Sequence, residues 1–295
     1  MASEPIRLKT LLGDHPGTLA LKRGDVKSDK VALDIADIPA AFVAFKRVVR
    51  DFEFDVAELA IVTYLMAKAH GKPYVLLPAV VLSRFQHPFL VYNASGGELR
   101  PGDLAGKRVG IRSYSVTTTM WLRGVLMNDY GLDLSTVRWT TTEEAHIAEF
   151  KDPPNVQRAP AGRDLLAMLL DGELDAIVLG DKTLKDPRLA RLIPDPGKAA
   201  ADWHARNRAI QINHMVVVRD SVSKRNPDAV REVFRLLKES KQAAPAAGGL
   251  DMTPMGLAGM RRDLEIAIEY VHQQKLIPRR FSVDELFDDV TRGLA

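Results

Sequence analysis

The chain of 295 residues carries 41 lysines and arginines against 38 aspartates and glutamates, which gives a formal net charge of +3. Because no block of like charge stands out, neither nucleic acid nor a membrane surface is an expected partner. Cysteine is absent, which excludes disulfides, Fe–S clusters, thiolate zinc sites and a cysteine nucleophile in this chain. A chain of this length is expected to fold as two lobes, each with its own core.

The first residues, "MASEPIRLKTLLGDHPG", lead straight into a strand-like run, without a basic segment followed by a long apolar one. This start predicts a cytoplasmic protein. No stretch approaches the roughly 18 uncharged apolar residues of a membrane span, so we expect no membrane insertion. The sequence does not decide the oligomeric state and leaves a homo-oligomer open.

Short apolar runs alternate along the chain with segments of helical period. The expected strands are 6–12, 31–38, 54–59, 74–83, 89–93, 107–111, 136–141, 175–180 and 212–219. The expected helices are 40–52, 117–131, 163–174, 226–244 and most of the tail from Leu257. Such alternation predicts an α/β protein with a parallel or mixed sheet.

We expect the chain to cross between the two lobes at two segments, 92–110 and 207–220. The first is rich in Gly, Ser and Pro, and each leads into a new strand. We therefore expect residues 1–94 and 209–295 to form a discontinuous lobe 1, and residues 95–208 to form lobe 2. In such an arrangement a ligand binds in the cleft between the lobes, where strand ends and helix N-termini face inward.

Two motifs indicate a particular fold. The stretch "DLAGKRVGI" (103–111), followed by a polar turn and a long helix, and the stretch "GRDLLAMLLDGELDAIVLGD" (162–181) resemble the second lobe of type 2 periplasmic-binding-protein folds. The resemblance implies an α/β, two-lobed type 2 periplasmic-binding-protein-like fold with a ligand cleft between the lobes. A fold of this kind does not identify a function by itself.

Further segments carry a narrower resemblance. They are "EFDVAELAIVTYLMAKAHGKPYVLLPAVV", "SYSVTTTMWLRGVLMNDYG", "VRWTT", "LIPDP" and "INHMVVVRD". Together, over roughly residues 5–240, they resemble the 4,5-dihydroxyphthalate decarboxylase family, whose members use this fold as an enzyme. The resemblance implies a carbon–carbon lyase that decarboxylates a hydroxylated aromatic carboxylate, such as 4,5-dihydroxyphthalate, without oxidation and without an organic cofactor.

Decarboxylation of an aromatic ring needs a proton donor. Direct loss of CO₂ would leave an in-plane carbanion that the ring cannot delocalise, so the carboxyl-bearing carbon is protonated first. A base that ionises a hydroxyl para to that carbon assists this step, and cations hold any other carboxylate.

The stretch "VVLSRFQHPFLVYN" (80–93) interrupts two apolar runs with Arg84, Gln86 and His87. The resemblance implies that His87 is catalytic and that Arg84 binds substrate, while Gln86 stands where the family has a basic residue. This departure leaves open whether the substrate is a dicarboxylate. The alternative is that Arg84 and His87 only cap strand ends and meet solvent.

Two more catalytic candidates are His214 and Glu58. His214 lies in the strand "INHMVVVR", at the second crossing between lobes. An imidazole there can act as acid or base. The resemblance implies that the family also has a histidine at this place in the strand. Glu58 closes the run "FDVAEL" and is a candidate proton donor if burial raises its pKa. Asp14 and His15 follow the first strand and are expected to bind substrate. Each of these residues has a structural alternative. His214 can be a histidine of the core, Glu58 a solvated carboxylate, and Asp14 only the cap of a helix.

The turn "GIRSYSVTTTMW" (110–121) opens a long helix and supplies the remaining substrate-binding candidates. The hydroxyls of Ser113, Ser115 and Thr117, together with free N–H groups of the helix, suit a carboxylate. Arg112 can add a bidentate contact, and Tyr114 can stack on the ring. The alternative is that these hydroxyls only cap the helix.

Metal binding would draw on the same residues. His15, His87 and His214 offer nitrogen ligands, with Asp14 or Glu58 as oxygen ligands, but no local spacing motif such as H-E-x-x-H joins them. We therefore expect no metal and no cofactor, and a small aromatic carboxylate as the binding partner.

Two other functions fit the same fold. A solute-binding protein for a small carboxylate ligand of an ABC importer would use the same cleft and arginines but no proton donor. The missing leader and the histidines near the expected cleft argue against it. A relative of thiamine-pyrimidine synthases is disfavoured because cysteine and an evident cofactor lysine are absent.

Overall fold

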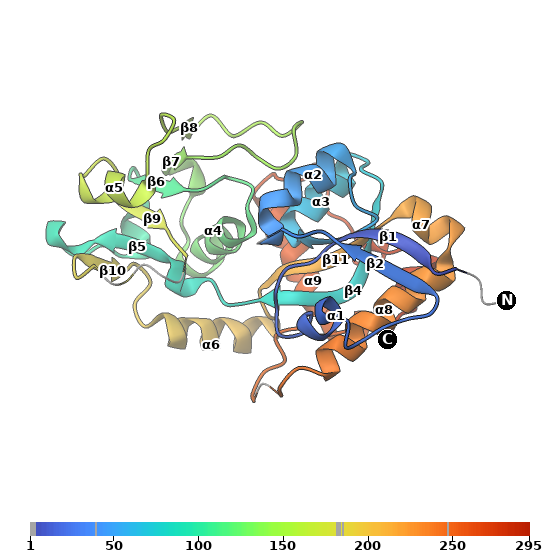
Figure 1. Cartoon of the computed structure of the whole chain (residues 1–295). Helices are drawn as coiled ribbons and strands as arrows, with labels where there is room; N and C mark the ends of the chain where they lie inside the picture. The colour runs from blue at the N-terminus through green and yellow to red at the C-terminus, as the bar shows by residue number, and fades with distance from the viewer. Residues whose placement is uncertain (1–3, 39, 181–183, 185, 247) are drawn as a thin grey trace. The chain divides into compact units, whose positions relative to one another are not determined.

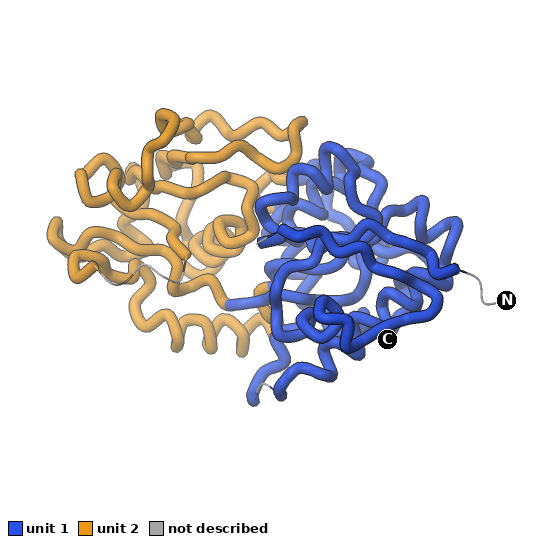
Figure 2. The backbone as a smooth tube through the Cα atoms, viewed as in Figure 1, with its two compact units in different colours: residues 1–84, 212–272, 277–295 blue, residues 85–211, 273–276 orange. Residues whose placement is uncertain are grey.

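The computed structural model describes residues 4–38, 40–180, 184, 186–246 and 248–295. The chain divides into two compact units (Figure 2). Unit 1 comprises Met1–Arg84, Ile212–His272 and Ile277–Ala295, and unit 2 comprises Phe85–Gln211 and Gln273–Leu276. The predicted crossings, after residues 94 and 208, differ from these bounds because Leu90–Asn93 pairs with strands of unit 2.

Unit 1 is built on a five-stranded mixed sheet (Figure 1). Its strands, in spatial order, are β2 (Val31–Ile35), β1 (Ile6–Leu11), β3 (Val56–Ala60), β11 (Ile212–Arg219) and β4 (Tyr74–Ser83). β1 runs parallel to β2 and β3, whereas β11 runs antiparallel to both β3 and β4. Every residue of the central strand β3 is buried, as expected for a strand that is covered on both faces.

Helices pack against this sheet from several parts of the chain. They are α1 (Leu19–Arg23), α2 (Phe45–Asp51), α3 (Ile61–Ala69), α7 (Asp220–Arg225), α8 (Pro227–Gln242), α9 (Leu257–Gln273) and α10 (Asp289–Arg292), with the 3₁₀ turns η1 (Ala41–Ala44) and η6 (Asp284–Leu286). α8 begins with Pro227 at its first helical position, as the Asn-Pro pair predicts. Its residues Val230, Val233 and Phe234 belong to the same core cluster as Val56 of the sheet.

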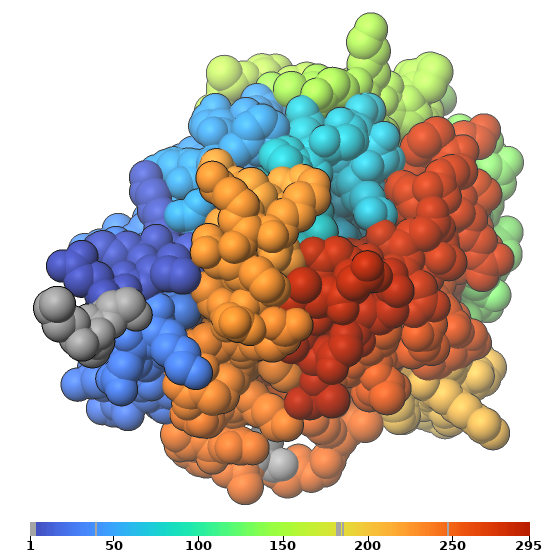
Figure 3. Space-filling model, turned by 90° about the vertical axis from the view of Figure 1, so that its right-hand side faces the viewer, coloured from blue at the N-terminus to red at the C-terminus, as the bar shows by residue number. Residues whose placement is uncertain are grey.

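The C-terminal segment of unit 1 lies against α7 and α8 on one face of the molecule (Figure 3). The Ser223 hydroxyl bonds to the carboxylate of Asp288 at 2.6 Å, and Lys238 Nζ donates to the carbonyl of Ala295 at 3.0 Å. These bonds attach the last turn of the chain to the helices that cover the sheet.

Unit 2 is built on a six-stranded mixed sheet. Its strands, in spatial order, are β10 (Leu189–Arg191), β5 (Leu90–Asn93), β9 (Ala176–Val178), β6 (Arg108–Ile111), β7 (Arg138–Thr141) and β8 (Val156–Arg158). The other elements of unit 2 are α4 (Thr117–Tyr130), α5 (Leu165–Leu170) and α6 (Pro196–Asn207), with the 3₁₀ turns η2 (His87–Phe89), η3 (Ala94–Gly96), η4 (Pro101–Leu104) and η5 (Leu134–Thr136).

Two tryptophans join α4 to α6 within unit 2. The rings of Trp121 and Trp203 are both fully buried and meet edge to face, with their centroids 5.9 Å apart. Such aromatic pairs bury large apolar areas and fix the distance between two helices. Among the helices of the described residues, none is long and apolar enough to cross a bilayer.

Candidate functional site

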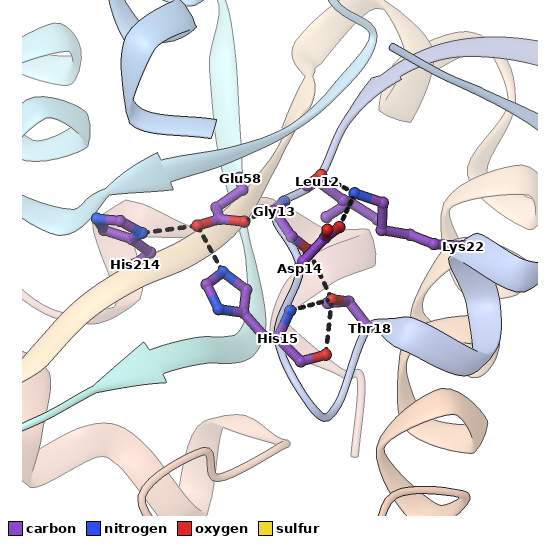
Figure 4. Close-up of polar contacts among 8 residues, drawn as sticks. All are labelled: Leu12, Gly13, Asp14, His15, Thr18, Lys22, Glu58 and His214. Atoms are coloured by element: carbon purple, nitrogen blue, oxygen red, sulfur yellow. Dashed lines mark hydrogen bonds and ion pairs between the residues drawn. The ribbon is translucent and has the colours of Figure 1, made fainter. Parts of the chain in front are cut away.

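Three of the predicted site residues meet in unit 1. Glu58 lies on β3, His214 on β11, and His15 in the loop that follows β1 (Figure 4). In the antiparallel pair of β3 and β11, Glu58 stands opposite Val216, so His214, two residues along, projects from the same face of the sheet. The sheet order β1–β3–β11 therefore brings the three side chains together.

The carboxylate of Glu58 is the centre of this cluster. Its Oε1 lies 2.6 Å from Nδ1 of His214 and 2.9 Å from Nε2 of His15. Its Oε2 accepts the N–H of Gly13 at 2.7 Å. The Glu58 side chain is 1% exposed, whereas those of His15 and His214 are 16% and 14% exposed. The buried carboxylate thus holds two imidazoles that reach solvent.

The surroundings fix both rings. The hydroxyl of Thr18 accepts the N–H of His15 at 3.0 Å and donates to the carbonyl of Gly13 at 2.7 Å, which closes the loop after β1. Phe45 meets the ring of His214 edge to face at 5.1 Å. Because a carboxylate only accepts, the ring nitrogen that faces Oε1 must carry the proton in each histidine. The opposite nitrogens, Nδ1 of His15 and Nε2 of His214, are then the ones left for a ligand.

The pKa of Glu58 is lowered, whereas we expected burial to raise it. Burial alone raises the pKa of Glu58, but the hydrogen bonds and charges of His15 and His214 outweigh it and hold that pKa well below its usual range. The condition under which we expected a proton donor, a pKa raised by burial, is therefore not met, and this lowered pKa favours the ionised carboxylate. An anion in this position stabilises a protonated imidazole beside it.

Asp14 is separate from the cluster although it precedes His15. Its carboxylate pairs with Lys22 at the surface, and this hydrogen bond lowers the pKa of Asp14. Lys22 also donates to the carbonyl of Leu12 at 3.0 Å. The charge of Asp14 is therefore compensated locally, which fits the alternative of a structural role.

The three clustered residues also have the composition of a metal site. His15, Glu58 and His214 each offer one ligand atom, and these atoms lie within 4.8 Å of one another. The sequence offers all three as possible ligands, but no local motif joins them, because they come from three separate segments of the chain. Both imidazole protons already point at Oε1, so a divalent ion would bind only after both rings move their protons to the opposite nitrogen. As arranged here, the cluster suits proton transfer.

His87 lies in unit 2 rather than in the cluster of unit 1. It is fully buried in η2, and its ring contacts Phe85 and Trp203 at centroid distances of 6.4 and 6.5 Å. Neither ring nitrogen has a hydrogen-bond partner among the described residues. Burial, with the nearby charge of Arg206 as a second cause, lowers the pKa of His87 to about 4. The imidazole is therefore neutral near pH 7.

This pKa predicts a pH-dependent stability. An unfolded histidine has a pKa of about 6.5, so the unfolded chain binds the proton first as the pH falls, and stability is lost between about pH 6.5 and pH 4. We expect the free energy of unfolding to drop by about 1–2 kcal/mol more in the wild type than in His87→Phe between about pH 7 and pH 5.5. Urea denaturation at both pH values measures the difference, with His70→Ala, an exposed histidine, as the control. Equal pH dependence in the wild type and His87→Phe would contradict the assignment.

The turn before α4 gathers three of the predicted hydroxyls. Ser113, Ser115 and Thr117 are all buried at the start of the helix. Neither Ser113 Oγ nor Thr117 Oγ1 has a hydrogen-bond partner among the described residues. Tyr114 is buried as well, but the guanidinium of Arg123 lies 3.4 Å above its ring. One face of Tyr114 is thus covered by the protein itself.

The two predicted arginines lie in different units. Arg112, in unit 2, is partly exposed, and its guanidinium lies 3.6 Å from the carboxylate of Glu143. Arg84 is half-buried and is the last residue of unit 1 before the chain enters unit 2. The side chain of Gln86, at the place where the resemblance implies a basic residue, is fully buried, and its backbone N–H donates to Gln211 Oε1 at 2.7 Å. A neutral amide suits this buried place, because a charge there would need a partner.

Comparison with solved structures shows the fold. The alkanesulfonate-binding protein SsuA from Xanthomonas axonopodis pv. citri, bound to MOPS, is 14% identical, with a TM-score of 0.56 over 97% of this chain and 99% of that one. The ligand-binding component of an ABC-type import system from Staphylococcus aureus is 10% identical, with a TM-score of 0.61 over 98% of this chain and 99% of that one. The chain therefore has the α/β fold of periplasmic solute-binding proteins, as predicted.

Comparison of sequences shows the family. No family model matches the chain. The 4,5-dihydroxyphthalate decarboxylase of Comamonas testosteroni is 28% identical over 252 residues, 81% of this chain and 76% of that protein. The 4,5-dihydroxyphthalate decarboxylase of Pseudomonas putida is 31% identical over 222 residues, 69% of this chain and 85% of that protein. The chain therefore belongs to the 4,5-dihydroxyphthalate decarboxylase family.

Proposed function

We propose that this protein is a cofactor-independent, non-oxidative decarboxylase of a hydroxylated aromatic carboxylate such as 4,5-dihydroxyphthalate, and thus a carbon–carbon lyase. The names of its relatives support the reaction type. The observation that carries the proposal is the buried Glu58 carboxylate, hydrogen-bonded to two histidines that reach solvent. This arrangement supplies the acid and the base that the reaction needs.

The reaction uses the cluster in two proton transfers. One imidazole accepts the proton of the ring hydroxyl para to the carboxyl-bearing carbon, and electron density moves to that carbon. The other, as imidazolium, protonates the carbon. The C–C bond then breaks, its electron pair restores the aromatic ring, and CO₂ leaves while the hydroxyl oxygen regains its proton.

Glu58 stabilises the imidazolium in this scheme and donates no proton itself, because its pKa is lowered. We assign the acid and base roles to His214 and His15 as a pair. His87 receives no proton-transfer step in this scheme, because its ring is fully buried and a pKa lowered to about 4 makes it a weak base. The hydroxyls at the start of α4 remain candidates for a substrate carboxylate.

Gly13 offers a way to disturb the cluster without changing any of its members. A Cβ at this position would lie 2.9 Å from Glu58 Oε2 and 2.9 Å from His15 Nε2, closer than such atoms approach. We expect Gly13→Ala to separate the carboxylate from His15 and to lower kcat by up to about 10²-fold, as small displacements in active sites do. Steady-state kinetics tests this. Gly17→Ala is the matched control, because its added Cβ would meet Lys241 at an ordinary 3.7 Å.

Wild-type kcat in Gly13→Ala would show that the contact between Glu58 and His15 does not matter for turnover. A loss of activity in Gly17→Ala as large as that in Gly13→Ala would point to general disturbance of the loop after β1.

The direct test of the function is incubation of purified protein with a panel of hydroxylated benzoates and phthalates, before and after removal of metals. CO₂ release and product identity are followed by chromatography. Turnover supports the proposal and identifies the carboxyl group that leaves. Tight binding of the panel without turnover would instead support a solute-binding protein for a small carboxylate. The cytoplasmic location stays a prediction, which cell fractionation tests.

A further inference from the structure

The cluster of His15, Glu58 and His214 has the donor atoms of a zinc site. Each residue offers one ligand atom, and these three atoms lie within 4.8 Å of one another (Figure 4). Two imidazole nitrogens, one carboxylate oxygen and an open fourth position form a common donor set of zinc ions that still bind water or another ligand. Among the described residues, no second group of three such side chains meets in this way.

The distances in the cluster are close to those around a bound ion. In a tetrahedral zinc site, ligand atoms about 2.0–2.2 Å from the metal lie roughly 3.4 Å from one another. Nδ1 of His214 and Nε2 of His15 lie 2.6 and 2.9 Å from Oε1 of Glu58. To admit zinc, each nitrogen must therefore move away from Oε1 by less than about 1 Å. Oε2 can keep its hydrogen bond from the N–H of Gly13, so the carboxylate binds through Oε1 alone.

The surroundings of the cluster suit metal binding. The side chains of His15 and His214 are 16% and 14% exposed, which leaves an ion a route from solvent to the buried carboxylate. The hydroxyl of Thr18 closes the loop that carries His15, and Phe45 contacts the ring of His214 edge to face. Partners of this kind orient the ligands of a metal and raise its affinity.

The nitrogen ligands select the kind of ion. Mg²⁺ and Ca²⁺ bind in proteins through oxygen, whereas zinc accepts imidazole nitrogen and carboxylate oxygen together. Zinc has no redox chemistry, and its usual coordination number of four is completed here by three side chains and one water. Zinc is therefore the ion that fits the cluster best.

We infer that zinc binds to Nε2 of His15, Nδ1 of His214 and Oε1 of Glu58, and that it inhibits decarboxylation from this site. The inhibition rests on the proposed function. When zinc binds, the proton of each coordinating nitrogen moves through water to the opposite nitrogen of the same ring. Each imidazole then has no lone pair to accept a proton from the substrate and cannot become the imidazolium that protonates the ring carbon. Zinc thus acts against the reaction, which itself needs no metal.

The first test is calorimetric titration of the metal-stripped full chain with zinc chloride. We expect His15→Ala, His214→Ala and Glu58→Gln each to weaken binding by about 10²-fold or more, because even residues that only orient the ligands are worth about 10- to 100-fold. His70→Ala, which removes an exposed histidine outside the cluster, is the control and should bind as the wild type does. Circular dichroism shows whether each variant is folded.

The second test follows decarboxylation as zinc chloride is added to the wild type. We expect turnover to fall in step with the occupancy measured by calorimetry, by about 10²-fold or more at saturation, as when general acid–base catalysis is removed. Turnover should return when a chelator removes the zinc. Magnesium chloride is the control ion and should leave turnover unchanged, because Mg²⁺ prefers oxygen ligands.

Several outcomes would overturn the inference. An absence of zinc binding to the wild type would do so, as would unchanged affinity in any one of the three variants that is folded. Turnover that rises with zinc, or that persists when the site is occupied, would overturn the inhibition. Zinc binding that depends on the three residues, in a protein that turns over no member of the panel, removes the proposed reaction alone. Turnover without zinc binding removes the zinc site alone.

Discussion

Replacing Glu58 with glutamine is expected to lower kcat for decarboxylation by about 10²- to 10⁴-fold, the range found when general acid–base catalysis is removed. The amide keeps the size of the side chain and can still accept the N–H of Gly13, but it carries no charge to stabilise a protonated His214 or His15. The loss should therefore appear in kcat rather than in substrate binding. Steady-state kinetics with the best substrate of the panel measures both.

His214→Ala is expected to cause a loss of similar size, because the carboxylate and the imidazole act as one unit. The double variant should then lose little more than either single one, since effects within such a unit do not add. His70→Ala, an exposed histidine outside the cluster, is the matched control. Wild-type kcat in Glu58→Gln and in His214→Ala would remove the cluster from the mechanism.

The largest effect on stability is expected at Trp203. Its ring is fully buried and meets those of Trp121, Phe85 and His87 at centroid distances of 5.9, 6.1 and 6.5 Å. Only Ala200 and Trp203 of α6 are buried, so this ring is the main attachment of the helix. We expect Trp203→Ala to lower the free energy of unfolding by about 3–5 kcal/mol, the usual result of removing a large aromatic side chain from a core.

Urea denaturation followed by circular dichroism measures this loss. Trp203→Phe keeps part of the aromatic contact and should lose clearly less, whereas Lys198→Ala, at an exposed position of α6, controls for damage to the helix itself. A loss below about 1 kcal/mol for Trp203→Ala would show that α6 does not depend on this contact.

The strands of the fold could be predicted better than some of its helices. Apolar runs revealed β1, β4 and β11, and the Asn-Pro pair revealed the start of α8. α3 was not predicted, because every residue of Ile61–Ala67 is buried and the helix therefore has no polar face that would show a period of 3.6 residues. α6 was not predicted for a different reason: Trp203 is its one large apolar residue and only two of its residues are buried, so no apolar face repeats along it.

The members of the site could be predicted, but their arrangement could not. His15 and His214 are 43 and 156 residues from Glu58, and only the sheet order shows that all three share one carboxylate oxygen. Gly13 gave no signal beyond its place after a strand. Arg123 had the pattern of a solvated residue on a helix, but it is buried and donates to Gln274, 151 residues away. Long-range contacts of this kind leave no local pattern.

The position of β11 between β3 and β4 has a consequence for synthesis of the chain on the ribosome. All six strands of unit 2 lie between Leu90 and Arg191, so they are translated before β11 emerges. Until Ile212–Arg219 is made, β3 and β4 lack the strand that joins them, and their edges stay open to wrong pairing in the nascent protein. Unit 2 can therefore complete its sheet before the sheet of unit 1 is complete, and the contact of Glu58 with His214 forms only after the six strands of unit 2 have been made.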